Sequence, residues 1–75
     1  MKVTLENTTK IVHLNGVPAR IWEGVTERGV RVHAFISRIA VPNDAPEEQE
    51  RFAQELKEEK APSAEAAAYP LRMIL

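Results

Sequence analysis

The chain contains no cysteine, only three glycines and only four aromatic residues among its 75 residues. Without cysteine there can be no disulfide, no cysteine-based zinc site and no thiol nucleophile, and such a composition is typical of a reducing compartment. The glycines are too widely spaced to form a phosphate-binding loop or a dinucleotide fingerprint. A chain this short forms one domain with a small core. Association into a homodimer would bury more surface, and we hold it as a hypothesis from size alone.

Long apolar runs and a strong excess of one charge are also missing. No run is long enough to span a membrane, and no signal-peptide pattern follows Met1, so we expect a cytoplasmic protein. The net charge of −1 gives no general signal for nucleic acid. Residues 1–43 carry six basic and three acidic side chains, whereas residues 44–75 carry four basic and eight acidic ones. A mildly basic first half is therefore followed by an acidic second half.

Residues suited to catalysis or metal binding are equally sparse. His13 and His33 lie six residue levels apart on the expected hairpins, or about 20 Å, which is too far to share a metal ion within one chain. Neither serine lies in a nucleophile-elbow pattern. The adjacent glutamates at 47–48 and 58–59 lie on an expected helix that faces water, so they are solvated charges. We expect no enzyme, no cofactor and no bound metal.

The first half of the chain has the pattern of β-strands. Asn15-Gly16 lies between two β-forming segments, which is the strongest short signal of a two-residue hairpin turn. A second turn lies near Arg28-Gly29, and apolar residues alternate from Val30 onward. Val3 and Leu5 suggest a short additional strand at the start. We therefore expect an antiparallel meander of three to five strands over about residues 2–41.

The second half begins with a helix. Pro46 followed by glutamates is typical of a first helical turn, and the helix should extend over about residues 46–59. Its thin apolar stripe can pack on one face of the sheet. Residues 61–75 follow, and their apolar end should pair with Val3–Leu5 or with the edge of a second protomer. The sequence thus predicts a single α+β domain over residues 1–75, with a small antiparallel sheet and one helix packed on one face.

The hairpin registers decide which side chains share a face of the sheet. With two-residue turns at both positions, Leu14 pairs with Val17 and Trp22 pairs with Phe35. A three-residue loop at 27–29 would move every later residue to the opposite face. With the two-residue turns, the helix would cover an apolar core face made of Val12, Leu14, Val17, Ala19, Ile21, Val25, Val32, Ala34 and Ile36.

The opposite face holds the main functional hypothesis. It would place a cross-strand pair of large aromatic side chains among basic residues. An exposed apolar patch usually marks a binding surface, and tryptophan and arginine are enriched at binding hot spots. The candidate partner-binding residues are Arg20, Trp22, Arg31, His33 and Phe35.

Three other interpretations of this face stay open. Trp22 and Phe35 would be core residues if the Ala64–Tyr69 segment or the C-terminal tail covered them. Aromatic side chains flanked by arginine also suit base stacking on single-stranded nucleic acid, although the net charge and the acidic helix disfavour it. The third interpretation is a small structural subunit of an assembly.

Two segments carry a resemblance to a known group of proteins. The segments NGVPARIWEG (residues 15–24) and YPLRMIL (residues 69–75) together resemble small uncharacterised proteins encoded by tailed bacteriophages and prophages of Gram-negative bacteria. The resemblance implies a bacterial origin and an accessory role in binding host or phage proteins, and it assigns no site residue. We therefore expect a small non-enzymatic interaction protein that binds a protein partner or itself, with no membrane partner.

Overall fold

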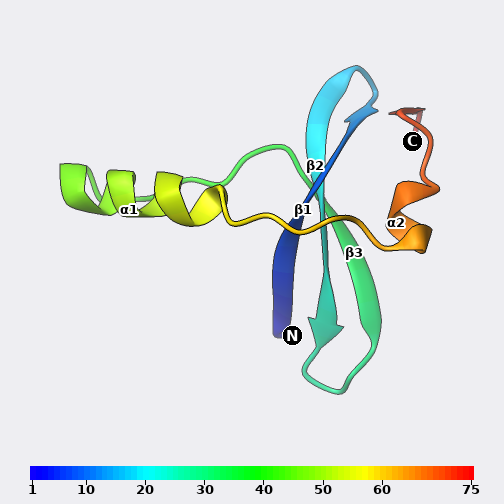
Figure 1. Ribbon diagram of the computed structural model, residues 1–75, viewed down its shortest axis with the longest axis horizontal. Helices are drawn as coiled ribbons and strands as arrows, with labels where there is room; N and C mark the ends of the chain where they lie inside the picture. Colours follow the sequence, from blue (N-terminus) through cyan, green and yellow to red (C-terminus); the bar gives the residue numbers. More distant parts are fainter.

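The computed structural model describes all 75 residues and contains one four-stranded sheet and two helices (Figure 1). The strand order is β3-β2-β1-β4, antiparallel except for β4, which is parallel to β1. This arrangement confirms the predicted α+β class, with its antiparallel meander followed by a helix. In chain order the elements are β1 (Val3–Leu14), β2 (Val17–Thr26), β3 (Arg31–Ile36), α1 (Pro46–Leu56), α2 (Ala64–Ala67) and β4 (Arg72–Met73).

The first hairpin forms as predicted. Asn15 and Gly16 have φ angles of 50° and 84°, the left-handed values that a tight two-residue turn requires. Leu14 pairs with Val17 across the turn, and the expected register continues to Ile11.

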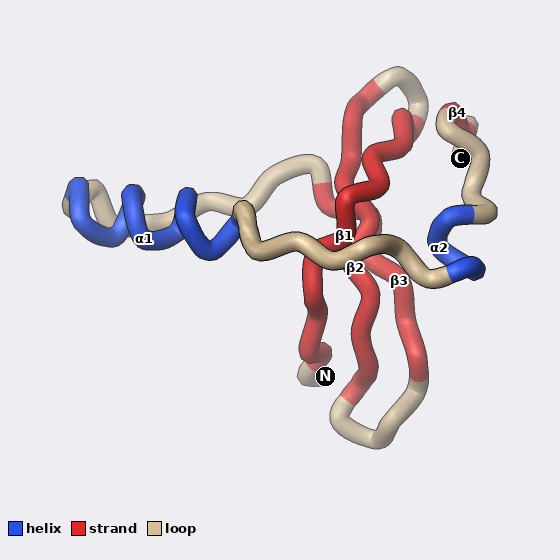
Figure 2. The backbone as a smooth tube through the Cα atoms, viewed as in Figure 1, coloured by secondary structure: helices blue, strands red, loops and turns tan.

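Beyond Ile11, a bulge bends β1 between Asn7 and Ile11. The buried Thr8 stabilises it: the Thr8 hydroxyl donates a hydrogen bond to the Ile21 carbonyl oxygen at 2.7 Å and accepts one from the Lys10 amide at 3.2 Å. The strand continues through the bulge without a break. The separate first strand that was expected at Val3 and Leu5 is therefore the beginning of β1. In Figure 2 the path of β1 changes direction about halfway along the strand.

The second hairpin differs from the predicted one by a single residue. The Thr26 amide donates to the Val30 carbonyl oxygen at 2.9 Å, which leaves residues 27–29 as a three-residue loop that closes with Gly29 at a φ of 85°. As a result Phe35 pairs with Ile21. The predicted Trp22–Phe35 pair was wrong, because one extra loop residue moves every side chain of β3 to the other face.

We call the sheet face that carries Ile21 the inner face and the face that carries Trp22 the outer face. The core lies on the inner face, where Val12, Ile21 and Ala66 of α2 are fully buried. Around them pack the half-buried side chains of Leu14, Phe35, Tyr69 and Met73. The predicted core face therefore holds Phe35 in place of Val32, Ala34 and Ile36.

Helix α1 does not cover the core face, contrary to the prediction. It has no buried residue, and Figure 1 shows it extending away from the sheet. It also ends at Leu56 rather than near residue 59, because the chain after it must become extended to reach β1. There the Lys60 amide donates to the Asn7 carbonyl oxygen at 3.2 Å, and the Thr9 amide donates to the Lys60 carbonyl oxygen at 3.0 Å.

The C-terminal segment crosses the inner face and ends beside the first hairpin. Lys10 fixes its direction, since the ammonium donates to the carbonyl oxygens of Ala67 at 2.6 Å and Tyr69 at 2.8 Å. Strand β4 then pairs with His13 and Leu14. The tail therefore joins the end of β1 opposite to the predicted Val3–Leu5. Neither helix has the length and apolar character needed to cross a membrane.

Candidate interaction surface

The structure divides the five predicted site residues between the two faces of the sheet. Arg20 and Trp22 lie on the outer face, opposite Ile36 and Ala34 of β3. Arg31, His33 and Phe35 lie on the inner face, because the three-residue loop shifts the register of β3. The five residues therefore do not form one surface.

The three inner-face residues contact the chain's own C-terminal segment. Tyr69 packs edge-on against Phe35, with ring centroids 5.0 Å apart, and against His33 at 5.6 Å. The His33 Nδ1 atom lies 3.1 Å from the Tyr69 hydroxyl, and Arg31 forms an ion pair with Glu65 at 2.8 Å. Cover by the Ala64–Tyr69 segment is thus correct for Phe35. His33 packs against the same segment, whereas the Arg31 side chain is exposed and forms only the surface ion pair.

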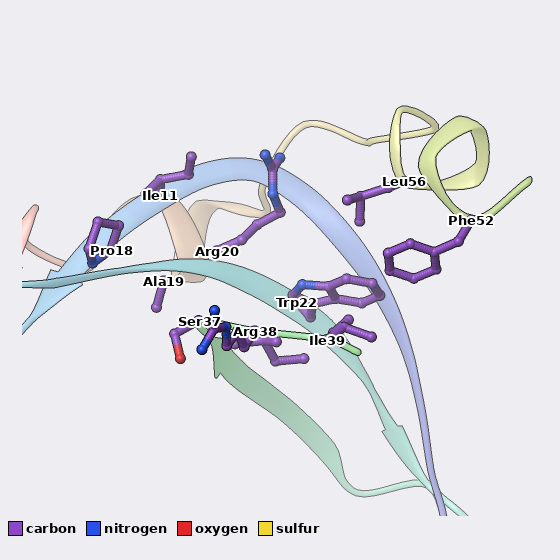
Figure 3. A pocket seen from close by; sticks show the side chains of 11 residues that line it. Ile11, Pro18, Ala19, Arg20, Trp22, Ser37, Arg38, Ile39, Phe52 and Leu56 are labelled. Atoms are coloured by element: carbon purple, nitrogen blue, oxygen red, sulfur yellow. The ribbon is translucent and has the colours of Figure 1, made fainter. Parts of the chain in front are cut away.

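Trp22 and Arg20 instead line an open groove of about 260 Å³ on the outer face (Figure 3). One wall is the sheet, the second is the segment that follows β3, and the third is α1. Seven of the eleven lining residues are apolar. Ile11 and Ile39 are each 44% exposed, so apolar surface here is open to solvent. The apolar lining includes Ile11, Trp22, Ile36, Ile39, Phe52 and Leu56.

The two arginines that line the groove, Arg20 and Arg38, differ in whether their charge is paired. The Arg20 guanidinium pairs with the Glu59 carboxylate and donates to the Thr8 carbonyl oxygen at 2.8 Å, so it is held against its own chain. Arg38, which also lines the groove, takes part in none of the four ion pairs of the structure. The groove therefore combines an apolar floor with one uncompensated positive charge.

Glu23 on the inner face stabilises the fold, and this role was not predicted from the sequence. Glu23 is only 7% exposed, and its carboxylate accepts a hydrogen bond from the Ser63 hydroxyl. The Ser63 amide donates to both carboxylate oxygens, at 3.2 and 3.3 Å. The Lys60 ammonium lies 3.2 Å from it. The Ser63 hydroxyl lowers the pKa of Glu23 most; burial opposes this, and Lys60 and the Ser63 amide lower the pKa further.

This cluster holds the returning chain against the sheet. Both Glu23 oxygens are engaged by Ser63 and Lys60, while the His33 Nε2 atom is 3.7 Å away, beyond a normal hydrogen bond. Strand alternation could have pointed to it, because Glu23 falls on the same face as Ile21, where a charge needs partners. No group of three or more histidine, aspartate and glutamate side chains is arranged to hold a metal ion.

No family model matches the chain, and no curated protein or solved structure matches it either. The resemblance to phage-encoded proteins therefore stays a prediction.

Proposed function

We propose that this chain is a small non-enzymatic interaction protein, and that it binds a segment of a partner protein in the outer-face groove at Trp22. The observation that supports the proposal is the open apolar groove itself, which no other part of the chain covers. Solvent-exposed apolar surface around a tryptophan and an arginine is the usual composition of a protein-binding hot spot.

The apolar walls of the groove suit a short peptide segment of a partner protein. The Phe52 and Leu56 side chains of α1 point toward Trp22 across the groove (Figure 3). Burying two apolar side chains of a partner there would contribute roughly 3–6 kcal/mol before the entropy cost of association. We therefore expect an isolated peptide to bind with a Kd of about 40 μM or weaker. The free Arg38 charge favours a partner with an acidic residue next to its apolar ones.

A selection from a displayed peptide library on the immobilised protein tests this proposal. Trp22 is the only tryptophan, so its emission reports occupation of the groove directly. We expect enriched peptides that combine an apolar pair with an acidic residue and that change the Trp22 emission. Ile39→Ser should weaken their binding at least about tenfold, a loss of about 1.4 kcal/mol.

Leu71→Ser is the matched control, because Leu71 is 65% exposed and lies outside the groove. It should leave peptide binding unchanged. Failure to enrich any peptide, or peptides that bind the Ile39→Ser variant as tightly as the native chain, would contradict the proposal.

The alternative function, binding of single-stranded nucleic acid, was based on a Trp22–Phe35 pair that the structure does not contain. Base stacking of the expected kind needs Trp22 and Phe35 on one surface, and the register of β2 and β3 puts them on opposite faces. No observation favours nucleic acid as a partner. A bacterial cytoplasmic location fits an accessory interaction protein and is part of the proposal.

A further inference from the structure

We propose that β3 pairs with β3 of a second copy of this chain, antiparallel and about a two-fold axis at His33, to form a continuous eight-stranded sheet. The dimer contact is made by the free backbone edge of the sheet, and of the residues from Val30 to Ile36 only Ile36 also lines the Trp22 groove. The inference therefore does not depend on the proposed function.

The backbone of β3 is available for such pairing. β3 is the last strand of the sheet, and its ladder with β2 starts at the hydrogen-bonded pair of Thr26 and Val30. In an antiparallel ladder, hydrogen-bonded and non-bonded positions alternate. The N–H and C=O groups of Arg31, His33 and Phe35 therefore point away from β2, toward the open edge.

The edge has little protection against pairing. Natural sheets block an edge strand with proline, lysine, a bulge or a covering element. β3 contains neither proline nor lysine, and its register with β2 is regular from Arg31 to Ile36. Six residues are enough to form a hydrogen-bonded ladder with another strand of equal length.

A second copy suits this edge because the pattern of β3 is symmetric about His33. From Val30 to Ile36 the sequence reads VRVHAFI, with apolar residues at every even position. Pairing about His33 places Val32 opposite the partner's Ala34, and Val30 opposite the partner's Ile36. All the outer-face pairs across the axis would be apolar, and cross-strand apolar pairs stabilise a sheet. The same register pairs all three outward-facing backbone positions of each strand.

The chain also has physical reason to associate. Only four apolar residues are buried in the monomer, which contains no disulfide and no metal cluster. Chains of this size commonly gain stability through oligomerisation. Val30, 60% exposed in the single chain, would gain an apolar neighbour in the dimer. Such a two-fold contact is isologous and closes after two copies.

The test is the mass in solution of the native chain and of two variants at Arg31. Arg31→Pro removes an outward-facing N–H and puts a ring at the edge, and an edge strand tolerates proline at its first residue. Arg31→Ala removes the same ion pair with Glu65 but leaves the backbone intact. We expect the native chain and Arg31→Ala to have twice the chain mass of 8.4 kDa in sedimentation equilibrium, and folded Arg31→Pro to have the single mass.

Amide hydrogen exchange locates the contact without relying on a variant. The His33 and Phe35 amides should become protected as concentration rises, because only the dimer gives them acceptors. A native chain that stays monomeric at millimolar concentration overturns the proposal, and so does a dimer in which these amides stay unprotected. Ile39→Ser, which tests the groove, should leave the dimer mass unchanged, so the two proposals fail independently.

Discussion

The inner and outer faces of the sheet carry similar apolar side chains but differ in how far the rest of the chain covers them. Each face has large apolar side chains from β2 and β3: Ile21 and Phe35 inside, Trp22 and Ile36 outside. The inner face is covered by α2 and the tail, and Ile21 is fully buried. The outer face meets only one side of α1 and keeps an open groove. Apolar content alone therefore does not decide which face becomes the core.

What separates the faces is the path of the chain after α1. Asn7 donates a hydrogen bond to the Leu56 carbonyl oxygen at 2.8 Å on the outer side. Lys60 then pairs with the edge of β1 at the bulge, and Ser63 reaches Glu23 on the inner side. The chain thus passes around the edge of β1, and polar contacts direct α2 to the inner face. Buried polar groups here select between two apolar surfaces.

Ile21 and Trp22 are neighbours in β2 and lie on opposite faces, so substituting each of them tests directly how the two faces differ in stability. Ile21→Ala empties a fully buried site and should lower the free energy of unfolding by about 3 kcal/mol. Trp22→Ala removes a larger but half-buried side chain and should cost roughly 1–2 kcal/mol. Urea unfolding followed by circular dichroism measures both, since the second variant has no tryptophan. Equal losses would mean that the outer face is as much a core as the inner one.

The next largest effect should come from disrupting the polar contacts that hold α2 and the C-terminal tail on the inner face. Glu23→Gln keeps the shape of the side chain but removes the charge that Lys60 and Ser63 bind, and should cost roughly 2 kcal/mol. Amide exchange should show the 60–69 segment opening first, with the β1–β2 hairpin still protected. As a control, Glu65→Gln removes the exposed partner of Arg31 and should change stability by less than about 0.5 kcal/mol. A Glu23→Gln variant as stable as the native chain would contradict the role given to this cluster.

The same carboxylate predicts an acid-sensitive fold. The pKa of Glu23 lies below its ordinary value of 4.5 in the folded chain, so folding favours the charged form. This contribution to stability is complete above the unfolded pKa and is lost as the pH falls through the lowered folded pKa. Unfolding followed from pH 6 to pH 2 should show a loss that is smaller in Glu23→Gln. Identical pH profiles for the two chains would assign the acid sensitivity to other carboxylates.

The local part of the fold could be predicted from the sequence. Asn15-Gly16 predicts the first turn because both residues tolerate positive φ, and the pairing from Leu14 to Ile11 follows from it. Pro46 and the glutamates after it predict where α1 begins. Each of these features depends on residues that are neighbours in the chain.

The division of the site residues could not be predicted, because it depends on a loop length and on distant partners. Arg28-Gly29 suits a two-residue turn and the last two positions of a three-residue loop equally well. Ser63 meets Glu23 across 40 positions of sequence, and no local pattern encodes that contact. Trp22 lies on the face of β2 opposite to Ile21, as strand alternation predicts, whereas Phe35 was assigned to the wrong face because of the one-residue shift.

The smallest effect we predict concerns the loop at residues 27–29, which determines the face on which each side chain of β3 lies. Gly29 has a φ of 85°, and a Cβ atom there would meet nothing within 4 Å. Gly29→Ala therefore adds backbone strain without a steric clash, and should lower the free energy of unfolding by about 1 kcal/mol. Gly29→Asn should cost less, because asparagine tolerates the left-handed region. Urea unfolding of the three chains measures the order. An alanine variant as stable as the native chain would mean that the glycine is not what holds the three-residue loop, and that the contact of Tyr69 with Phe35 keeps β3 in register instead.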